Sequence, residues 1–210
     1  DKIRVREAFA LVRHNEQLQR YLFGVTLCAA IRTSTIPFAV VMLRREIGFS
    51  SGDILLTTLA FYTGALVSLY LWGAISDRIG SAPIFRWTSL GMAALILLLV
   101  SIDSNDAQSL GLMLVFFFAF NALTAGFGVA DTQVLFQLTP LDTPARTLVI
   151  CGVITNGSRA LAPVVAGLAL EVALGRTDDR LSVYHAFFVA MALLQAVAFL
   201  PLRGFTRTAK

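Results

Sequence analysis

Two arginines, Arg32 and Arg159, interrupt long apolar stretches of the sequence. Each lies eleven or twelve residues inside its stretch, which is near the midplane of a bilayer if the stretch is a spanning helix rising about 1.5 Å per residue. An arginine at that depth costs roughly 2.5–3.5 kcal/mol and rarely faces lipid. Two such cations without a carboxylate at the same depth predict binding of an anionic or carboxylate-bearing solute. The alternative is two structural arginines that are hydrogen-bonded to backbone carbonyls.

Other polar side chains recur at helical spacing beside these arginines. Thr155 precedes Arg159 by four residues and shares its helical face. Asn121 and Thr124 lie together on one face of another apolar stretch. This pattern indicates polar faces that are turned away from lipid.

Two carboxylates, Asp131 and Glu171, are candidates for proton coupling because each lies at one end of an apolar stretch. The simpler interpretation of Asp131 is a solvated carboxylate at the inner end of its helix. Glu171 would then reach the outer membrane interface.

The sequence offers no support for an enzyme or a cofactor site. No glycine-rich segment ends in Lys-Ser or Lys-Thr, which disfavours an ATP-driven pump within this chain. No His, Cys or carboxylate spacing is typical of a metal site, and Cys28 and Cys151 are most simply small buried hydrophobes. Basic residues with interleaved aromatics are absent, so nucleic acid is not an expected partner.

Composition indicates the elements that position the arginines. Hydrophobic residues make up 57% of the chain and charged residues 14%, against roughly 25% charged in a soluble domain. A spanning helix needs about 20 mostly apolar residues. Six stretches meet this requirement, near Tyr21–Leu43, Ile54–Ile75, Ile84–Ile102, Leu110–Ala130, Thr147–Leu174 and Tyr184–Leu202. We therefore predict an all-α polytopic membrane protein whose bundle occupies residues 21–202.

Basic residues predict the orientation of this bundle. Eleven of them fall on the side that holds both termini: Lys2, Arg4, Arg6, Arg13, Arg20, Arg78, Arg86, Arg146, Arg203, Arg207 and Lys210. Four fall on the opposite side: Arg44, Arg45, Arg176 and Arg180. This bias places both termini in the cytoplasm, with the bundle in a cell (inner) membrane.

The segments outside the bundle are short. Residues 1–20 are rich in basic residues with apolar residues among them, which is typical of an amphipathic helix at the membrane surface. They also suit a linker from a preceding bundle, and the two interpretations are compatible. Residues 203–210 form a cytoplasmic tail. Because the chain begins at Asp1 without a methionine, we expect a piece of a longer chain.

One loop carries a family signature. Between the second and third stretches the chain reads Trp72-Gly73-Ala74-Ile75-Ser76-Asp77-Arg78-Ile79-Gly80-Ser81. This loop resembles the signature of the major facilitator superfamily, which lies after the second helix of a six-helix half on the cytoplasmic side. It departs from that signature at Ser81-Ala82-Pro83, where arginines are usual. Stretches 13–23, 140–146 and 162–167 resemble segments of the second half of that family.

The resemblance implies that the six stretches correspond to the seventh to twelfth helices of a twelve-helix transporter. It implies a conformational latch formed by Gly73, Asp77, Arg78 and Gly80. In that family the first and fourth helices of each half line a central cavity, and the second and fifth flank it. The substrate-cavity residues implied here are Arg32, Asn121, Thr124, Thr155 and Arg159.

Three functions are consistent with such a bundle. The first is a secondary transporter half that moves a small solute by alternating access. Its expected partners are membrane lipid and a second six-helix half, which is either a preceding N-terminal portion of the chain or a dimer partner. The second is a membrane enzyme, which lacks the convergent His, Asp or Glu side chains it needs. The third is a scaffold or sensor of the same fold that does not transport.

Overall fold

The computed structural model describes residues 15–139 and 144–202. These residues form six membrane-length helices joined by short turns and contain no strand. The predicted all-α class with six crossings is therefore confirmed. Residues 1–14 of the expected lead-in segment and the expected tail 203–210 lie outside the described residues, as does the turn 140–143.

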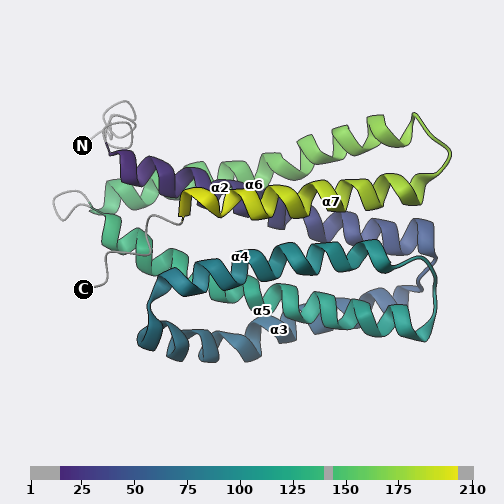
Figure 1. The fold of residues 1–210 in the computed structure, drawn as a ribbon, viewed down its shortest axis with the longest axis horizontal. Helices are drawn as coiled ribbons and strands as arrows, with labels where there is room; N and C mark the ends of the chain where they lie inside the picture. The colour runs from purple at the N-terminus through teal and green to yellow at the C-terminus, as the bar shows by residue number, and fades with distance from the viewer. Residues whose placement is uncertain (1–14, 140–143, 203–210) are drawn as a thin grey trace.

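The helices in chain order are α2 (Glu16–Met42), prolonged by a π-helical turn η1 (Leu43–Ile47), α3 (Ser51–Ile79), α4 (Ser81–Leu98), prolonged by a 3-10 turn η2 (Leu99–Ser101), α5 (Ala107–Leu138), α6 (Pro144–Leu174) and α7 (Arg180–Ala198). Each is long enough to cross a bilayer, with a mean hydropathy between 1.5 and 2.0 over its most apolar part. α2 begins and α7 ends at the same end of the bundle (Figure 1).

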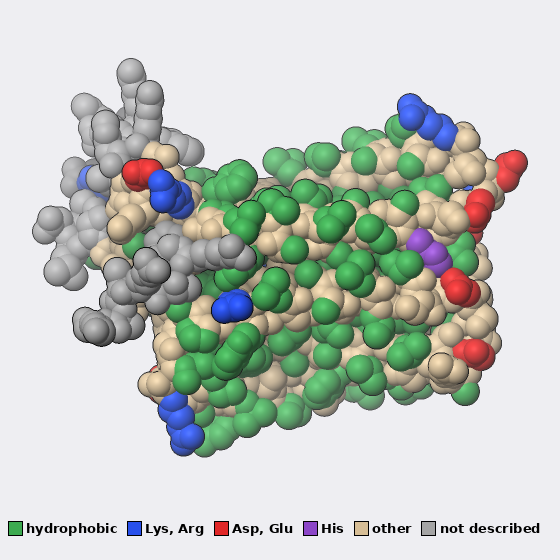
Figure 2. Space-filling view, in the orientation of Figure 1, with side chains coloured by type: hydrophobic (Ala, Val, Ile, Leu, Met, Phe, Trp, Pro, Cys, Tyr) green, Lys and Arg blue, Asp and Glu red, His purple; other side chains and the backbone are tan. Residues whose placement is uncertain are grey.

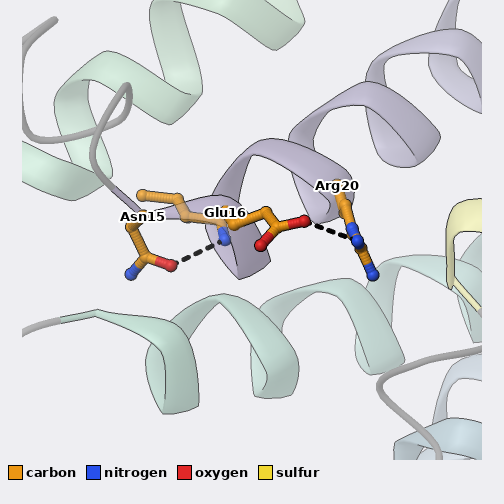
Figure 3. Close-up of polar contacts among 4 residues, drawn as sticks. Asn15, Glu16 and Arg20 are labelled. Atoms are coloured by element: carbon orange, nitrogen blue, oxygen red, sulfur yellow. Dashed lines mark hydrogen bonds and ion pairs between the residues drawn. The ribbon is translucent and has the colours of Figure 1, made fainter.

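Several helices extend beyond the predicted apolar stretches, because a helix continues until a cap or a turn ends it. α2 begins at Glu16, where Asn15 accepts a hydrogen bond from the backbone N–H of Leu18 at 3.1 Å. On the first turn the Arg20 guanidinium pairs with the Glu16 carboxylate at 2.5 Å (Figure 3). Residues 16–20, which were expected in the lead-in segment, therefore belong to the first spanning helix.

Two helices that start at the opposite end of the bundle carry aspartate caps. Asp106 accepts from the Ser109 backbone N–H at 2.7 Å, and Asp179 accepts from the Ser182 backbone N–H at 3.2 Å. Hydrogen bonds from these serines lower the pKa of both aspartates below the ordinary value of 3.8. The stabilisation they contribute is thus complete above pH 3.8 and is lost only as the pH falls through the lowered pKa.

The helices pack in the order α3, α5, α4, α7, α2, α6, and α2 and α5 scarcely touch each other. Figure 1 shows α3, α4 and α5 on one side of the molecule and α2, α6 and α7 on the other. The contact between α4 and α7 joins the two groups. α2 and α5, which carry the predicted cavity faces, are therefore held by their neighbours and not by each other.

The surface of the bundle is apolar along its length. Hydrophobic side chains cover the face in Figure 2, and most of the charged side chains gather at the two ends. α3 and α6 are the least buried helices, and large side chains such as Tyr70 and Leu66 on α3 are 83% and 80% exposed. Water would oppose such exposure, so the medium around these helices is lipid or another apolar surface.

The tightest packing joins α3 to α5 at two glycines. A Cβ atom placed on Gly64 would collide with the backbone carbonyl of Phe118. A Cβ on Gly126 would lie 2.5 Å from the Trp72 ring, whose Nε1 donates to the carbonyl oxygen of Ala122 at 2.7 Å. Small residues thus bring the two helix backbones together, as is usual in membranes. One wall of the bundle is thereby a rigid pair.

We expect Gly64→Ala to destabilise the protein by about 1–3 kcal/mol, because the added methyl group forces α3 away from α5. Thermal unfolding in detergent measures the change. Gly111→Ala on α5 is the matched control, since a Cβ there meets no atom within 4 Å. If Gly64→Ala unfolded at the same temperature as the unmodified protein, the close approach would be refuted.

Candidate functional site

A cavity of about 510 Å³ lies between α2 and α5. α3 contributes Phe61 and α6 contributes Arg159 to its lining, so four helices meet there. The remaining lining residues are Ala29, Arg32, Thr33, Ile36 and Pro37 from α2, and Phe120, Thr124, Gly128 and Asp131 from α5. The cavity is open on one side, where Pro37 and Arg159 are exposed. We call it the central pocket.

Arg32 is the buried cation of the central pocket, with 8% of its surface exposed. Its Nε–H donates to the carbonyl oxygen of Cys28, one turn earlier on α2, at 3.3 Å. Its guanidinium carbon lies 4.2 Å from the centre of the Phe127 ring, a favourable cation–π distance. A guanidinium has five N–H donors, and this arrangement occupies one of them. The remaining donors lack a carboxylate partner in the described part of the chain.

α7 contacts the residue whose carbonyl binds Arg32. Gln195 is fully buried, and its Nε2 donates to the Cys28 sulfur at 3.6 Å. Cys28 is therefore fixed by α7 on its side chain while its carbonyl holds Arg32. The sequence predicts Cys28 only as an ordinary buried hydrophobe and predicts no role for Gln195, because no spacing along the chain connects the two residues.

Asp131 also lines the central pocket, which corrects the interpretation of a solvated carboxylate at a helix end. The apolar pattern predicts that the fourth helix ends near Ala130, but α5 continues for about two further turns to Leu138. The Tyr21 hydroxyl donates to the Asp131 carboxylate and, at 3.0 Å, to its backbone carbonyl oxygen. Asp131 opens onto the same cavity as the two arginines, so the described pocket contains a carboxylate.

A sequence signal for this placement existed. Asn121, Thr124, Gly128 and Asp131 continue one helical spacing beyond the predicted helix end, which indicates that the helix itself continues. Asp131 at that end lines the central pocket, and apolar counting mistakes it for the membrane boundary. Tyr21 carried no such signal.

The other predicted cavity residues divide between the pocket and the packing. Arg159 is exposed at the open side, where its Nη1 donates to Asn156 Oδ1 at 3.3 Å. Thr124 lines the pocket, and its hydroxyl donates to the Phe120 carbonyl oxygen at 2.8 Å. Thr155 is buried on α6 and does not line the pocket.

Asn121 lies in the contact between α3 and α5 and not in the central pocket. Its Nδ2 donates to the Phe61 carbonyl oxygen at 2.8 Å. This bond joins the two helices beside the pocket and fixes the backbone of a residue that does line it. Glu171, the second coupling candidate, is exposed near the C-terminal end of α6 and is absent from the pocket lining.

The expected latch residues lie at the junction of α3 and α4. Gly80 adopts a φ of 74°, which glycine tolerates best, and the two helices are joined there by that single residue. Asp77 and Arg78 are exposed, and neither side chain bonds to another side chain in the described residues. A Cβ on Gly73 would meet no atom within 4 Å, so no helix approaches closely there.

The polar tie in this region is a different one. The hydroxyl of Ser76 donates to Gln133 Oε1 at 2.7 Å and joins α3 to α5. Ser76 is buried, directly before the exposed Asp77. The sequence predicts no role for Ser76, because burial of a serine is not visible in a motif.

The family of the chain follows from comparison with known proteins. The family model of the Major Facilitator Superfamily matches residues 22–210. Searches of the curated proteins and of the solved structures found no match. The match covers all six membrane-length helices apart from the first turns of α2. The chain therefore belongs to the Major Facilitator Superfamily, a family of membrane transporters.

Proposed function

We propose that this chain is one six-helix half of a secondary transporter that moves a small anionic solute by alternating access. The observation that carries the proposal is the state of Arg32. It is a buried cation in a cavity between two loosely associated helices. Its partners are a backbone carbonyl and an aromatic ring, where a buried arginine often has a carboxylate. A cation held in this way inside a membrane is prepared to receive an anion.

A second six-helix half completes the pocket in this proposal. Arg159 is exposed at the open side, and an arginine facing lipid at such depth is unfavourable. α3 and α6 flank the opening and are the least buried helices. A second half that covers this side would shield Arg159 from lipid and create the site between two halves that transporters of this kind use.

The proposed orientation follows the distribution of basic residues, with both termini in the cytoplasm of a cell whose inner membrane holds the protein. The proposed latch of Gly73, Asp77, Arg78 and Gly80 then lies on the cytoplasmic side. The exposure of Asp77 and Arg78 makes both side chains accessible to the second half. The tight turn at Gly80 transmits movement of α3 to α4.

α2 contains the feature that favours movement. Pro37 lines the pocket and removes a backbone hydrogen bond to the carbonyl of Thr33, one turn earlier. Hydroxyls of Thr33 and Thr35 bond to helix carbonyls at 2.9 and 2.8 Å, a pattern that bends helices. α2 can thus flex beside Arg32 while α3 and α5 remain a rigid pair.

Asp131 is the proposed proton-coupling residue. It opens onto the same cavity as both arginines, and the Tyr21 hydroxyl orients its carboxylate. Protonation of Asp131 would change the net charge of the pocket by one unit, which links proton binding to anion binding. Glu171 lacks this connection because it is exposed outside the pocket. A non-transporting sensor that binds an anion in the same pocket is the alternative, and a flux measurement distinguishes the two.

The first test measures uptake into proteoliposomes that contain the full-length protein. The probes are radiolabelled lactate, succinate, benzoate, 3-phenylpropionate and inorganic phosphate. We expect at least one to be taken up, and Arg32→Gln to lower that uptake about tenfold or more because a charge-assisted hydrogen bond is lost. Arg86→Gln, at an exposed arginine on α4 outside the pocket, is the control and retains uptake. Absence of flux with all probes, or equal flux in Arg32→Gln, contradicts the proposal.

The second test measures coupling. Asp131→Asn should abolish the dependence of uptake on a pH gradient, because the amide does not bind a proton in this range. Exchange of labelled for unlabelled anion at equal pH should continue. Glu171→Gln, the matched substitution outside the pocket, should leave the dependence of uptake on the pH gradient unchanged. If gradient-driven uptake survived in Asp131→Asn and failed in Glu171→Gln, the assignment of proton coupling to Asp131 would be wrong.

A further inference from the structure

The charges of the central pocket limit the charge of its ligand. Its charged lining residues among the described part of the chain are Arg32, Arg159 and Asp131. With Asp131 ionised, the described pocket carries one net positive charge. One negative charge on a ligand balances it, whereas a second would have no partner among the described lining residues, in a medium of low dielectric constant.

The geometry of Arg32 limits the shape of the charged group. The Phe127 ring covers the guanidinium, and the Cys28 carbonyl fixes its Nε, so the fork of remaining donors has a defined direction. Asp131 forms no ion pair with this fork in the described residues, and its carboxylate accepts a hydrogen bond from the Tyr21 hydroxyl. A planar group with two acceptors fits such a fork, and a carboxylate is the simplest one.

The rest of the pocket limits the body of the ligand. Phe61, Phe120, Ile36 and Pro37 present carbon to the cavity. A volume of about 510 Å³ is ample for a small organic molecule.

The two threonine hydroxyls of this lining are already engaged. The hydroxyl of Thr33 donates to the Ala29 carbonyl oxygen at 2.9 Å. The hydroxyl of Thr124 donates to the Phe120 carbonyl oxygen at 2.8 Å. Both hydrogens are thus used within their own helices, and the N–H donors that the described lining offers to a ligand belong to the two arginines, which favour an anionic group.

We infer that the ligand of the central pocket is an amphipathic organic monoanion: one carboxylate held by Arg32 with Arg159 nearby, and an apolar, flat body against Phe61 and Phe120. Asp131 acts as the residue that excludes a second negative charge. The inference rests on the proposed transport function, and it names the substrate class that the function alone leaves open.

The test compares three probes of one shape for binding to the full-length protein in detergent, by calorimetry. They are 3-phenylpropionate, its neutral amide 3-phenylpropionamide, and benzylmalonate, which adds a second carboxylate to the same body. Inorganic phosphate is the fourth probe and lacks the apolar body. We expect 3-phenylpropionate to bind about tenfold or more tightly than each of the others.

Two variants assign the selectivity to residues. Asp131→Asn should reduce the preference for 3-phenylpropionate over benzylmalonate about tenfold, because the pocket then carries one more net positive charge. Phe61→Leu should weaken binding of 3-phenylpropionate severalfold. Phe118→Leu, at an exposed side chain of α5 outside the pocket lining, should leave it unchanged.

The outcomes separate the inference from the proposed function. Equal or tighter binding of the amide, benzylmalonate or phosphate by the unmodified protein overturns the inference, while anion uptake would still uphold the transport proposal. An unchanged preference in Asp131→Asn removes the assigned role of that carboxylate. Failure of all probes to bind, together with absence of uptake of any anion, overturns both.

Discussion

The position of Arg32 constrains the rest of this structure. A guanidinium in the interior of a membrane protein requires partners for its donors and a surface for its charge. Here the Cys28 carbonyl accepts from one of the donors, and the Phe127 ring faces the charged group. Each comes from a helix that borders the cavity. α7 holds Cys28 through Gln195, so three helices determine where the charge lies. Because a carboxylate is not among these partners, the charge remains available within the cavity.

The packing of the helices explains how such a site can change shape. α3 and α5 are joined through Gly64, Gly126 and Trp72 and form a rigid wall. α2 lies across the pocket from α5 with scarcely any direct contact, and Pro37 interrupts its hydrogen bonding beside the cavity. The bond from Tyr21 to Asp131 is a polar link between these two helices. The width of the pocket therefore depends on few interactions, which suits the alternating access proposed for this chain.

The number of helices and their class were predictable because lipid imposes a simple rule on the sequence: a spanning segment must be apolar over a fixed length. The same rule failed at Asp131, which lines the cavity, so apolar counting ended α5 too early. The two arginines were predicted to share a site, and the central pocket contains both. The bond from Tyr21 to Asp131 was not predictable, because 110 residues separate its partners. Asn121 illustrates the same limit, since it was predicted to line the cavity while its contact joins α3 to α5. The bond from Ser76 to Gln133, which joins the same helices, had no sequence signal.

The central claim is that Arg32 receives a carboxylate inside the membrane. A structure of the full-length protein with bound 3-(4-iodophenyl)propionate tests it most directly, because anomalous scattering from iodine locates the body of the probe. We expect the carboxylate of the probe to lie within hydrogen-bond distance of the Arg32 guanidinium and its iodinated ring to lie beside Phe61 and Phe120. A probe located elsewhere, or an Arg32 that is already paired with a carboxylate of the second half, would contradict it.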